Sequence, residues 1–479
     1  MNLQGLRRHG RLGVVLPVLL AILWGTPATA FQFEFGEVDG SLDSTLSYGM
    51  SWRVEDRDKD IVGTANGGTA YSVNGDDGNL NYDDDKLISQ IAKITSDLEL
   101  RYKNFGLFVR GSAFYDYENE DRDRERTELT DDALELVGKD AELLDTYLWW
   151  DFDIGETFGQ LRLGDQVLSW GESTFIQNGI NVINPFDVSA LRVPGAELKE
   201  ALVPVGMISG SVSPNESFTF EAFYQYDWEK VEIDPTGSYW STNDFAGKGG
   251  QKVMLGFGDS PDFGNLPAEL TFLGVPRGAD DKPSDDGQYG LAIRVFAPGL
   301  NNTEFGFYYM NYHSRLPTIN AQTGTLDGAL AAQAIPGIAV GTIIPAVSSA
   351  LGGGATTEQA ILAGIGAGVG SGTTVPQAAV ISEAAATGGD VPSAIKASAT
   401  DAYANTARYI IEYPEDIQLF GVSFNTAFDS IGASLQGEYS YRKDAPLQID
   451  DVELLLAALS PLDDPDSNIL ADNLSLIHI

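Results

Sequence analysis

The chain of 479 residues contains no cysteine, and only three of its residues are histidines. The absence of cysteine excludes disulfides and thiolate metal sites. His9 lies in the export signal described below and His478 in an atypical C-terminal tail. A serine or cysteine enzyme built on an imidazole would therefore depend on His313.

Basic residues are also scarce, with 29 Lys and Arg against 69 Asp and Glu and a net charge of −40. We expect no nucleic acid as a partner, because binding one needs a basic surface. Strong negative charge is also typical of disordered chains, but 43% hydrophobic and 10% aromatic residues argue against disorder here.

Residues 1–30 predict a cleavable export signal. Arg7, Arg8 and Arg11 precede an apolar core at 12–24, and Ala-Thr-Ala at 28–30 fits the small-x-small cleavage rule. A transmembrane anchor is the alternative, but the core is shorter than the roughly 20 residues that a spanning helix needs. We find no uninterrupted apolar run of that length after residue 30.

Apolar and polar residues alternate with period two along much of the chain. Within 93–103, for example, Ile94 and Leu98 would face one side of a strand while Asp97 and Glu99 face the other. About eleven such segments recur, most of them near the length of a tilted membrane strand. They lie at 40–54, 91–103, 106–117, 143–155, 159–168, 205–213, 217–228, 288–297, 303–314, 416–428 and 431–442.

The gaps between these segments alternate strictly between short and long. The long ones are 55–90, 118–142, 169–204, 229–287 and 315–415. Tight turns at one end and long loops at the other are typical of outer-membrane barrels, whereas a soluble β-sandwich has no reason for this order. The sequence therefore predicts an all-β fold, a transmembrane antiparallel up-and-down β-barrel over 31–473 with long extracellular loops.

Eleven is an odd number, which bacterial single-chain barrels avoid, so we expect about 14–16 strands in an intact protein and a C-terminal truncation here. No closing strand follows Arg442, and residues 474–479 (Leu-Ser-Leu-Ile-His-Ile) match the translation of a transposon end used in sequencing adapters. We interpret them as a sequencing artefact, a hypothesis that an intact genomic copy encoding them would contradict.

Loop 169–204 carries the candidate site residues. It mixes aromatic and charged side chains in a way that suits a loop folded back into the lumen as a ligand or constriction loop; packing on the barrel rim is the alternative. The candidates are Trp170, Glu172, Phe175, Asp187, Arg192, Glu197 and Lys199. Glu172 and Glu197 could also be read as a carboxylate pair for glycoside hydrolysis, although the sequence gives no separation between them.

Two other loops have unusual composition. Residues 74–85 are rich in oxygen ligands, as a Ca²⁺ site would be, but lack the spacing and closing Glu of an EF-hand, which favours a solvated acidic loop. Residues 319–400 form an Ala/Gly-rich, low-complexity insertion. A helical excursion that contacts lipid or an apolar ligand, and a flexible segment, are the two alternatives for it.

The chain resembles the Gram-negative outer-membrane family known as domain of unknown function 1302. The resemblance runs from the signal to about Arg442. It rests on blocks that include Gly40-Ser-Leu-Asp-Ser-Thr-Leu-Ser-Tyr-Gly49, Ser169-Trp-Gly-Glu-Ser-Thr-Phe175 and Pro194-Gly-Ala-Glu-Leu-Lys-Glu200. It implies an outer-membrane location and work beside a resistance-nodulation-division exporter of the inner membrane and a periplasmic protein, handling hydrophobic compounds. It supplies no catalytic residues.

Three functions compete at this point. The first is passage or export of a small hydrophobic molecule through the outer membrane, in a barrel surrounded by outer-membrane lipid and inserted by the barrel-assembly machinery. The second is a surface-exposed structural or ligand-binding barrel. The third is an outer-membrane lipid hydrolase, which would need His313. We expect no enzyme activity and no cofactor.

Overall fold

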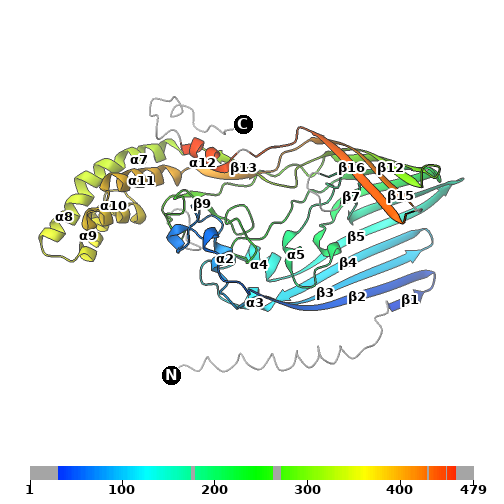
Figure 1. Ribbon diagram of the computed structural model, residues 1–479, viewed down its shortest axis with the longest axis horizontal. Coiled ribbons are helices and arrows are strands. Elements are labelled where there is room, and N and C mark those ends of the chain that lie inside the picture. Colours follow the sequence, from blue (N-terminus) through cyan, green and yellow to red (C-terminus); the bar gives the residue numbers. More distant parts are fainter. Residues whose placement is uncertain (1–30, 174–178, 263–270, 429–430, 449, 460–479) are drawn as a thin grey trace, which may run out of the picture.

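The computed structural model describes residues 31–173, 179–262, 271–428, 431–448 and 450–459. The predicted export signal, Phe175 and the six C-terminal residues lie outside this part of the chain. A single antiparallel sheet dominates the structure and forms its right-hand part in Figure 1.

Twelve strands build this sheet as a meander, in which each strand pairs with the next one in the order β1 to β8, β11, β12, β15, β16. Their bounds are β1 (Phe31–Phe35), β2 (Val38–Trp52), β3 (Leu87–Tyr102), β4 (Phe105–Asp116), β5 (Lys139–Ile154), β6 (Thr157–Gln166), β7 (Val205–Asn215), β8 (Phe218–Gln225), β11 (Gln288–Ala297), β12 (Thr303–Tyr312), β15 (Ile417–Phe428) and β16 (Ala433–Lys443). Short turns lie at one end of the sheet and the long connections at the other (Figure 1).

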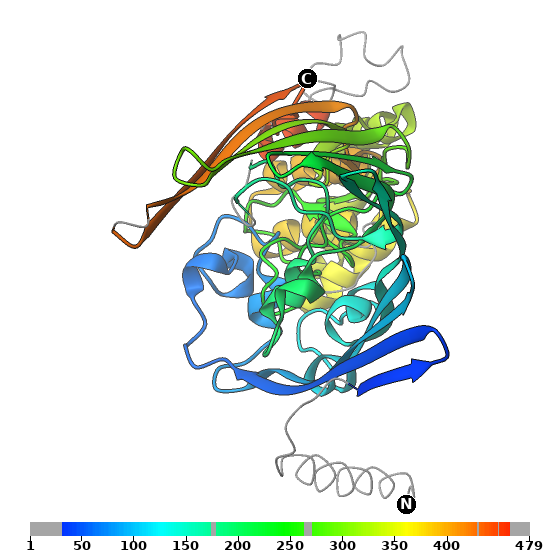
Figure 2. The ribbon, with the colours of Figure 1, turned by 90° about the vertical axis from the view of Figure 1, so that its right-hand side faces the viewer.

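All eleven segments predicted from the period-two pattern are strands of this sheet. The strand that was missed is β1, whose five residues fall well short of a membrane-strand length. The sheet is curved, but it is not the closed barrel that the sequence predicted: within the described residues β1 and β16 are its two edges, and they are not paired with each other (Figure 2).

One face of the sheet is apolar and exposed. The strand register sets apolar side chains beside one another: Leu148 lies opposite Leu163, Leu163 opposite Ile208, and Ile208 opposite Tyr224. Leu148, Leu163, Ile208 and Tyr224 are all exposed. The other face carries polar and charged residues, and part of the loops packs against it.

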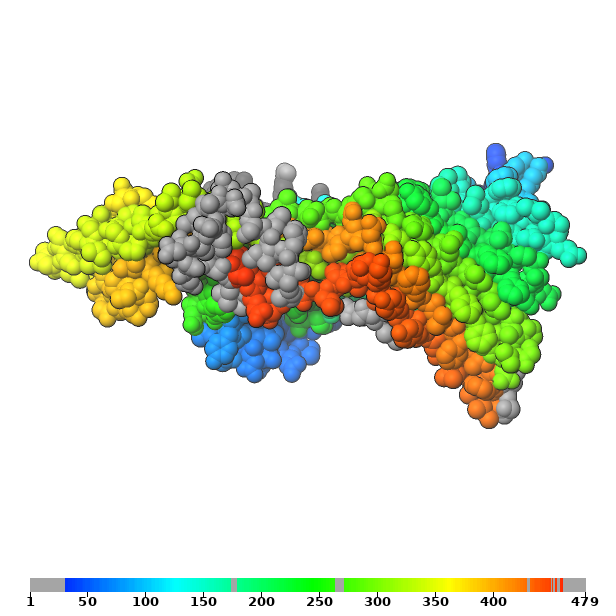
Figure 3. Space-filling view, turned by 90° about the horizontal axis from the view of Figure 1, so that it is seen from above, coloured from blue at the N-terminus to red at the C-terminus, as the bar shows by residue number. Residues whose placement is uncertain are grey.

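Short elements punctuate the long connections. They are η1 (Lys59–Ile61), η2 (Thr64–Asn66), α2 (Asp77–Leu80), α3 (Tyr117–Asp121), α4 (Asp131–Val137), α5 (Val188–Arg192), α6 (Leu198–Ala201), β9 (Lys252–Met254) and β10 (Gly274–Pro276). Helix α12 (Asp451–Leu459) follows β16. The two-stranded ribbon of β13 (Thr318–Gln322) and β14 (Arg408–Glu412) carries a helical arm that extends away from the sheet (Figures 1 and 3).

The helical arm consists of α7 (Leu326–Ile338), η4 (Ala339–Ile343), α8 (Ile344–Gly352), α9 (Thr357–Val369), α10 (Val375–Thr387) and α11 (Val391–Ala404). The helical alternative therefore describes the Ala/Gly-rich insertion. Capping boxes start two of the helices, Thr356 with Gln359 and Thr374 with Gln377.

The first part of the helical arm is unusually apolar. Leu326–Gly352 is continuous over 27 residues, and a stretch of 18 residues within it has a mean hydropathy of 1.7. By length and composition it is the one helix in the described part of the chain that could cross a membrane. Asp327, Gln333 and Pro336 interrupt the apolar residues of this helix, so its sequence contains no unbroken apolar run of spanning length.

Small residues let helix α9 pack closely in the arm. Ala360, Gly364 and Gly368 are buried on one side of α9. A Cβ at Gly364 would lie 2.3 Å from Ser382 Oγ and 2.6 Å from Val347 Cγ2, whereas a Cβ at Gly366 would meet nothing within 4 Å.

We therefore expect Gly364→Val to destabilise the arm by about 1–3 kcal/mol through overpacking. Gly366→Val is the matched control and should leave the arm unchanged, since it adds the same side chain to an open surface of the same helix. Limited proteolysis of the purified protein should cut the arm faster in the first variant. Equal cleavage of both variants would contradict this packing.

Candidate functional site

The crossing loop joins β6 to β7, and its described residues, 167–173 and 179–204, lie against the polar face of the sheet. Trp170 is fully buried there and donates from Nε1 to Glu221 Oε2 on β8 at 2.7 Å. Its ring lies 5.1 Å from that of Phe223 and 5.8 Å from that of Tyr308, measured between centroids. The described part of the loop therefore lies on the polar face of the sheet and not on its rim. Its role as a ligand or constriction loop in a lumen stays a prediction.

At one end the crossing loop is held by Glu438 of β16. The Glu438 carboxylate accepts hydrogen bonds from three backbone N–H groups, those of Glu172 at 2.7 Å, Ser173 at 3.2 Å and Ile180 at 2.9 Å. Gly171 permits this approach, because its φ is +85° and a Cβ there would lie 2.5 Å from Glu438 Oε2.

At its other end the loop is held by β3. The Glu200 carboxylate forms an ion pair with Lys93 and accepts a hydrogen bond from Thr95 Oγ1 at 2.6 Å. Both partners of the ion pair are buried, with side chains about 7% exposed. Glu197 and Glu200 also form the capping box that starts α6. The loop thus connects the third strand from one edge of the sheet with the last strand at the other edge.

The remaining candidate residues are spread along this loop and are not gathered in one place. Glu172 accepts a hydrogen bond from Asn425 on β15 at 3.2 Å, whereas Lys199 pairs with Glu197 at 3.1 Å and lies 3.9 Å from Asp97 on β3. Glu172 thus lies near one edge of the sheet and Glu197 near the other, which is not the arrangement of a glycosidase carboxylate pair.

Asp187 and Arg192 belong to helix α5 and its start. Asp187 caps α5 by accepting from Ala190 N at 3.0 Å, and burial raises its pKa to about 6. Arg192 pairs with Asp234 at 2.8 Å and stacks over Trp240 at 5.1 Å. These two contacts join the crossing loop to the 229–287 loop.

On the polar face of the sheet, arginine side chains lie between pairs of carboxylates. Arg110 lies between Asp97, at 2.8 Å, and Asp145, at 3.0 Å. Arg294 likewise lies between Glu221, at 2.7 Å, and Glu304, at 3.0 Å. Each arginine therefore balances two carboxylates, which gives this face a polar lining with excess negative charge.

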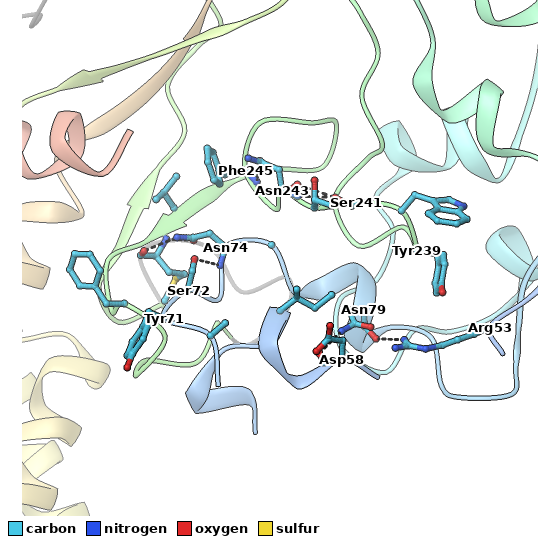
Figure 4. A pocket seen from close by; sticks show the side chains of 18 of the residues that line it. Arg53, Asp58, Tyr71, Ser72, Asn74, Asn79, Tyr239, Ser241, Asn243 and Phe245 are labelled. Carbon is cyan, nitrogen blue, oxygen red and sulfur yellow. Dashed lines mark hydrogen bonds between the residues drawn. The ribbon is translucent and has the colours of Figure 1, made fainter. Parts of the chain in front are cut away.

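A pocket of about 1100 Å³ opens in the layer of long loops beyond the sheet. Figure 4 shows residues of the first loop, such as Tyr71 and Asn79, facing residues of the 229–287 loop, such as Tyr239 and Phe245. Its exposed aromatic side chains are Tyr71, Trp240 and Phe257. Sequence reasoning missed this pocket because its walls come from segments more than 150 residues apart.

Two further sequence interpretations concern His313 and the acidic loop. His313 is buried; Nε2 lies 2.8 Å from the carbonyl of Asp286, and Nδ1 accepts from Asp416 N at 3.1 Å. Both ring nitrogens are occupied by backbone groups, so this imidazole is not placed as a general base.

In the 74–85 loop, Asp76 and Asp77 are buried, so the solvated-loop interpretation is wrong for them.

We expect Glu438→Ala to release the crossing loop, because three backbone donors lose a charged acceptor and such bonds are worth about 1.5–3 kcal/mol. Limited proteolysis should then cut residues 170–180 faster than in the parent protein. The control is Glu99→Ala, which removes a carboxylate whose partner on β3, Arg101, is more than half exposed. If both variants are cut alike, the Glu438 anchor is not what holds the loop.

Comparison with known proteins gives one match. Residues 11–471 match the family described as protein of unknown function DUF1302. No curated protein and no solved structure matches the chain. Because the family match covers nearly all of the sequence, the chain belongs to the DUF1302 family, as the resemblance of its sequence blocks predicted.

Proposed function

We propose that this protein is an outer-membrane β-barrel through which a small hydrophobic molecule passes or is exported. The observation that carries the proposal is the two-faced sheet, with rows of exposed apolar side chains on one face and paired charges on the other. A sheet in water has no reason to expose so many large apolar residues, whereas lipid favours them.

Closure of the barrel is part of the proposal. Within the described residues β1 and β16 pair with no further strand on their outer sides, and lipid does not tolerate an open sheet edge. We infer that further strand pairing joins these edges in the membrane. Outer-membrane lipid and the barrel-assembly machinery are the partners that such insertion requires.

The route of the molecule follows from the arrangement of the loops. The pocket offers Tyr71, Trp240 and Phe257 to an apolar solute at the loop end of the sheet. Beyond the pocket, the crossing loop narrows the lumen of the proposed barrel. Arg192 of the crossing loop contacts Trp240 of the pocket and so connects the loop with the pocket. The excess of carboxylates disfavours anions along this route. An inner-membrane exporter of the resistance-nodulation-division type and a periplasmic protein remain proposed partners on the family resemblance.

The second candidate function is a surface barrel that binds the same class of ligand without passing it on. The pocket favours this alternative as much as it favours transport, because a binding site at the loop end is common to both. Flux across a bilayer distinguishes them.

If the exposed apolar face meets lipid, Leu161→Arg should cost about 2–4 kcal/mol and lower the amount of folded protein in the outer membrane. Leu161 is 42% exposed on that face. The control is Gln160→Arg on the neighbouring position, which points to the polar face and lies 2.7 Å from Asp151. Heat-modifiable mobility of the outer-membrane fraction on a detergent gel measures both. Equal folding of both variants would contradict a lipid-facing belt.

For function, we expect proteoliposomes containing the protein to admit a fluorescent amphipathic solute, and a Tyr71→Ser, Phe257→Ser double variant to slow its entry at least severalfold. Leu447→Ser is the control, since Leu447 is 89% exposed and outside the pocket. Solute binding without entry would favour the surface-binding alternative. Neither binding nor entry for a panel of such solutes would count against both.

A further inference from the structure

Four aspartates from distant parts of the chain meet in one buried cluster. Asp76 and Asp77 lie at the start of α2 in the first loop, and Asp244 and Asp262 lie in the 229–287 loop. One carboxylate oxygen of each lies within 4.8 Å of one from every other member. All four residues are buried, at 0–8% exposure.

Nearby positive charge does not balance four carboxylates. Arg126 pairs with Asp77 at 3.4 Å and also with Asp262. Lys252 interacts electrostatically with the same two carboxylates, while its Nζ donates to Thr271 Oγ1 at 3.0 Å. Two cations against four buried anions leave a net negative charge in a site with little water, which is a costly arrangement.

The pKa values reflect this cost. Burial, reinforced by Asp262, raises the pKa of Asp77 to about 7. Burial and the neighbouring Asp77 carboxylate also hold the pKa of Asp244 well above its usual range.

A buried oxygen of Asp244 is a second feature of the cluster. Asp244 is more than nine-tenths buried, and its Oδ2 accepts from Asp77 N at 3.3 Å. Its Oδ1 is buried and has no hydrogen-bond partner among the described residues. The Asn66 amide faces Asp76 and Asp262 from the side, at 2.9 Å and 3.1 Å, and its Oδ1 also lacks a partner there. A buried acceptor without a donor is rare unless an ion or water satisfies it.

We propose that Asp76, Asp77, Asp244 and Asp262 bind one Ca²⁺ ion. Hard cations take oxygen ligands, and Ca²⁺ accepts six to eight of them in a flexible geometry that carboxylates from separate loops can supply. The mature protein would meet the ion outside the cell, where weak calcium sites are occupied. The proposal does not depend on transport.

The ion would join the two walls of the loop pocket. Asn74, two residues before the cluster, exchanges hydrogen bonds with Met254 at 2.7 and 2.9 Å, and its carbonyl accepts from Asp244 N at 2.9 Å. Asn74 and Met254 both line the pocket. Binding of Ca²⁺ would therefore fix the position of the first loop against the 229–287 loop.

The test uses the purified full chain in detergent, freed of metal with a chelator and titrated with CaCl₂ by calorimetry. We expect one Ca²⁺ per chain, and a higher unfolding temperature in Ca²⁺ than in chelator. Asp244→Asn should weaken binding at least tenfold. Asp85→Asn, which neutralises an exposed carboxylate of the same loop, should bind Ca²⁺ like the parent protein.

Folding of the variant is checked in the chelator. There Asp244→Asn should unfold at the same temperature as the parent or higher, because it removes a buried charge, and only the parent should gain stability from Ca²⁺. Absence of Ca²⁺ binding by the folded parent protein would overturn the proposal. So would equal binding by Asp244→Asn and parent, or a response to Mg²⁺ alone.

Discussion

The structure depends on how the polar face of the sheet satisfies its charges. A twelve-stranded meander with one apolar face leaves rows of Arg, Lys, Asp and Glu on the other, and buried charges are tolerated only in pairs. The crossing loop completes this pairing, through Glu200 with Lys93 on β3 and through the backbone that Glu438 binds on β16. The same contacts connect strands near the opposite edges of the sheet.

The long loops form a second layer that builds on the first. Arg192 of the crossing loop contacts Trp240 in the 229–287 loop, and the four aspartates join the first loop to the 229–287 loop. The pocket therefore lies between segments that these contacts hold together. The ribbon of β13 and β14 packs beside the same layer through a buried cluster that includes Phe245, Tyr409 and Ile411. The site is therefore a property of the loop layer, while the sheet supplies its support.

Local pattern explains which features could be predicted from the sequence. The eleven long strands follow from period two alone. The mixture of Trp170 with charged residues is consistent with a loop that packs on the polar face of the sheet. The capping boxes at Thr356 and Thr374 were readable signals for the helical arm. The aspartate cluster could not be predicted from the sequence, because Asp244 and Asp262 lie more than 160 residues from Asp76. Composition shows only that the first loop is acidic. Closure of the sheet was expected and is absent from the described residues.

The most direct test of the central claim exploits the absence of native cysteine. Single cysteines at Ile208, on the apolar face of β7, and at Ser211, on its polar face, can each carry a bimane fluorophore in the protein reconstituted into lipid bilayers. The account predicts that brominated lipid quenches the fluorophore at position 208 and aqueous iodide quenches the one at 211. Quenching of both by iodide, with no effect of brominated lipid on either, would show that the apolar face does not meet a membrane.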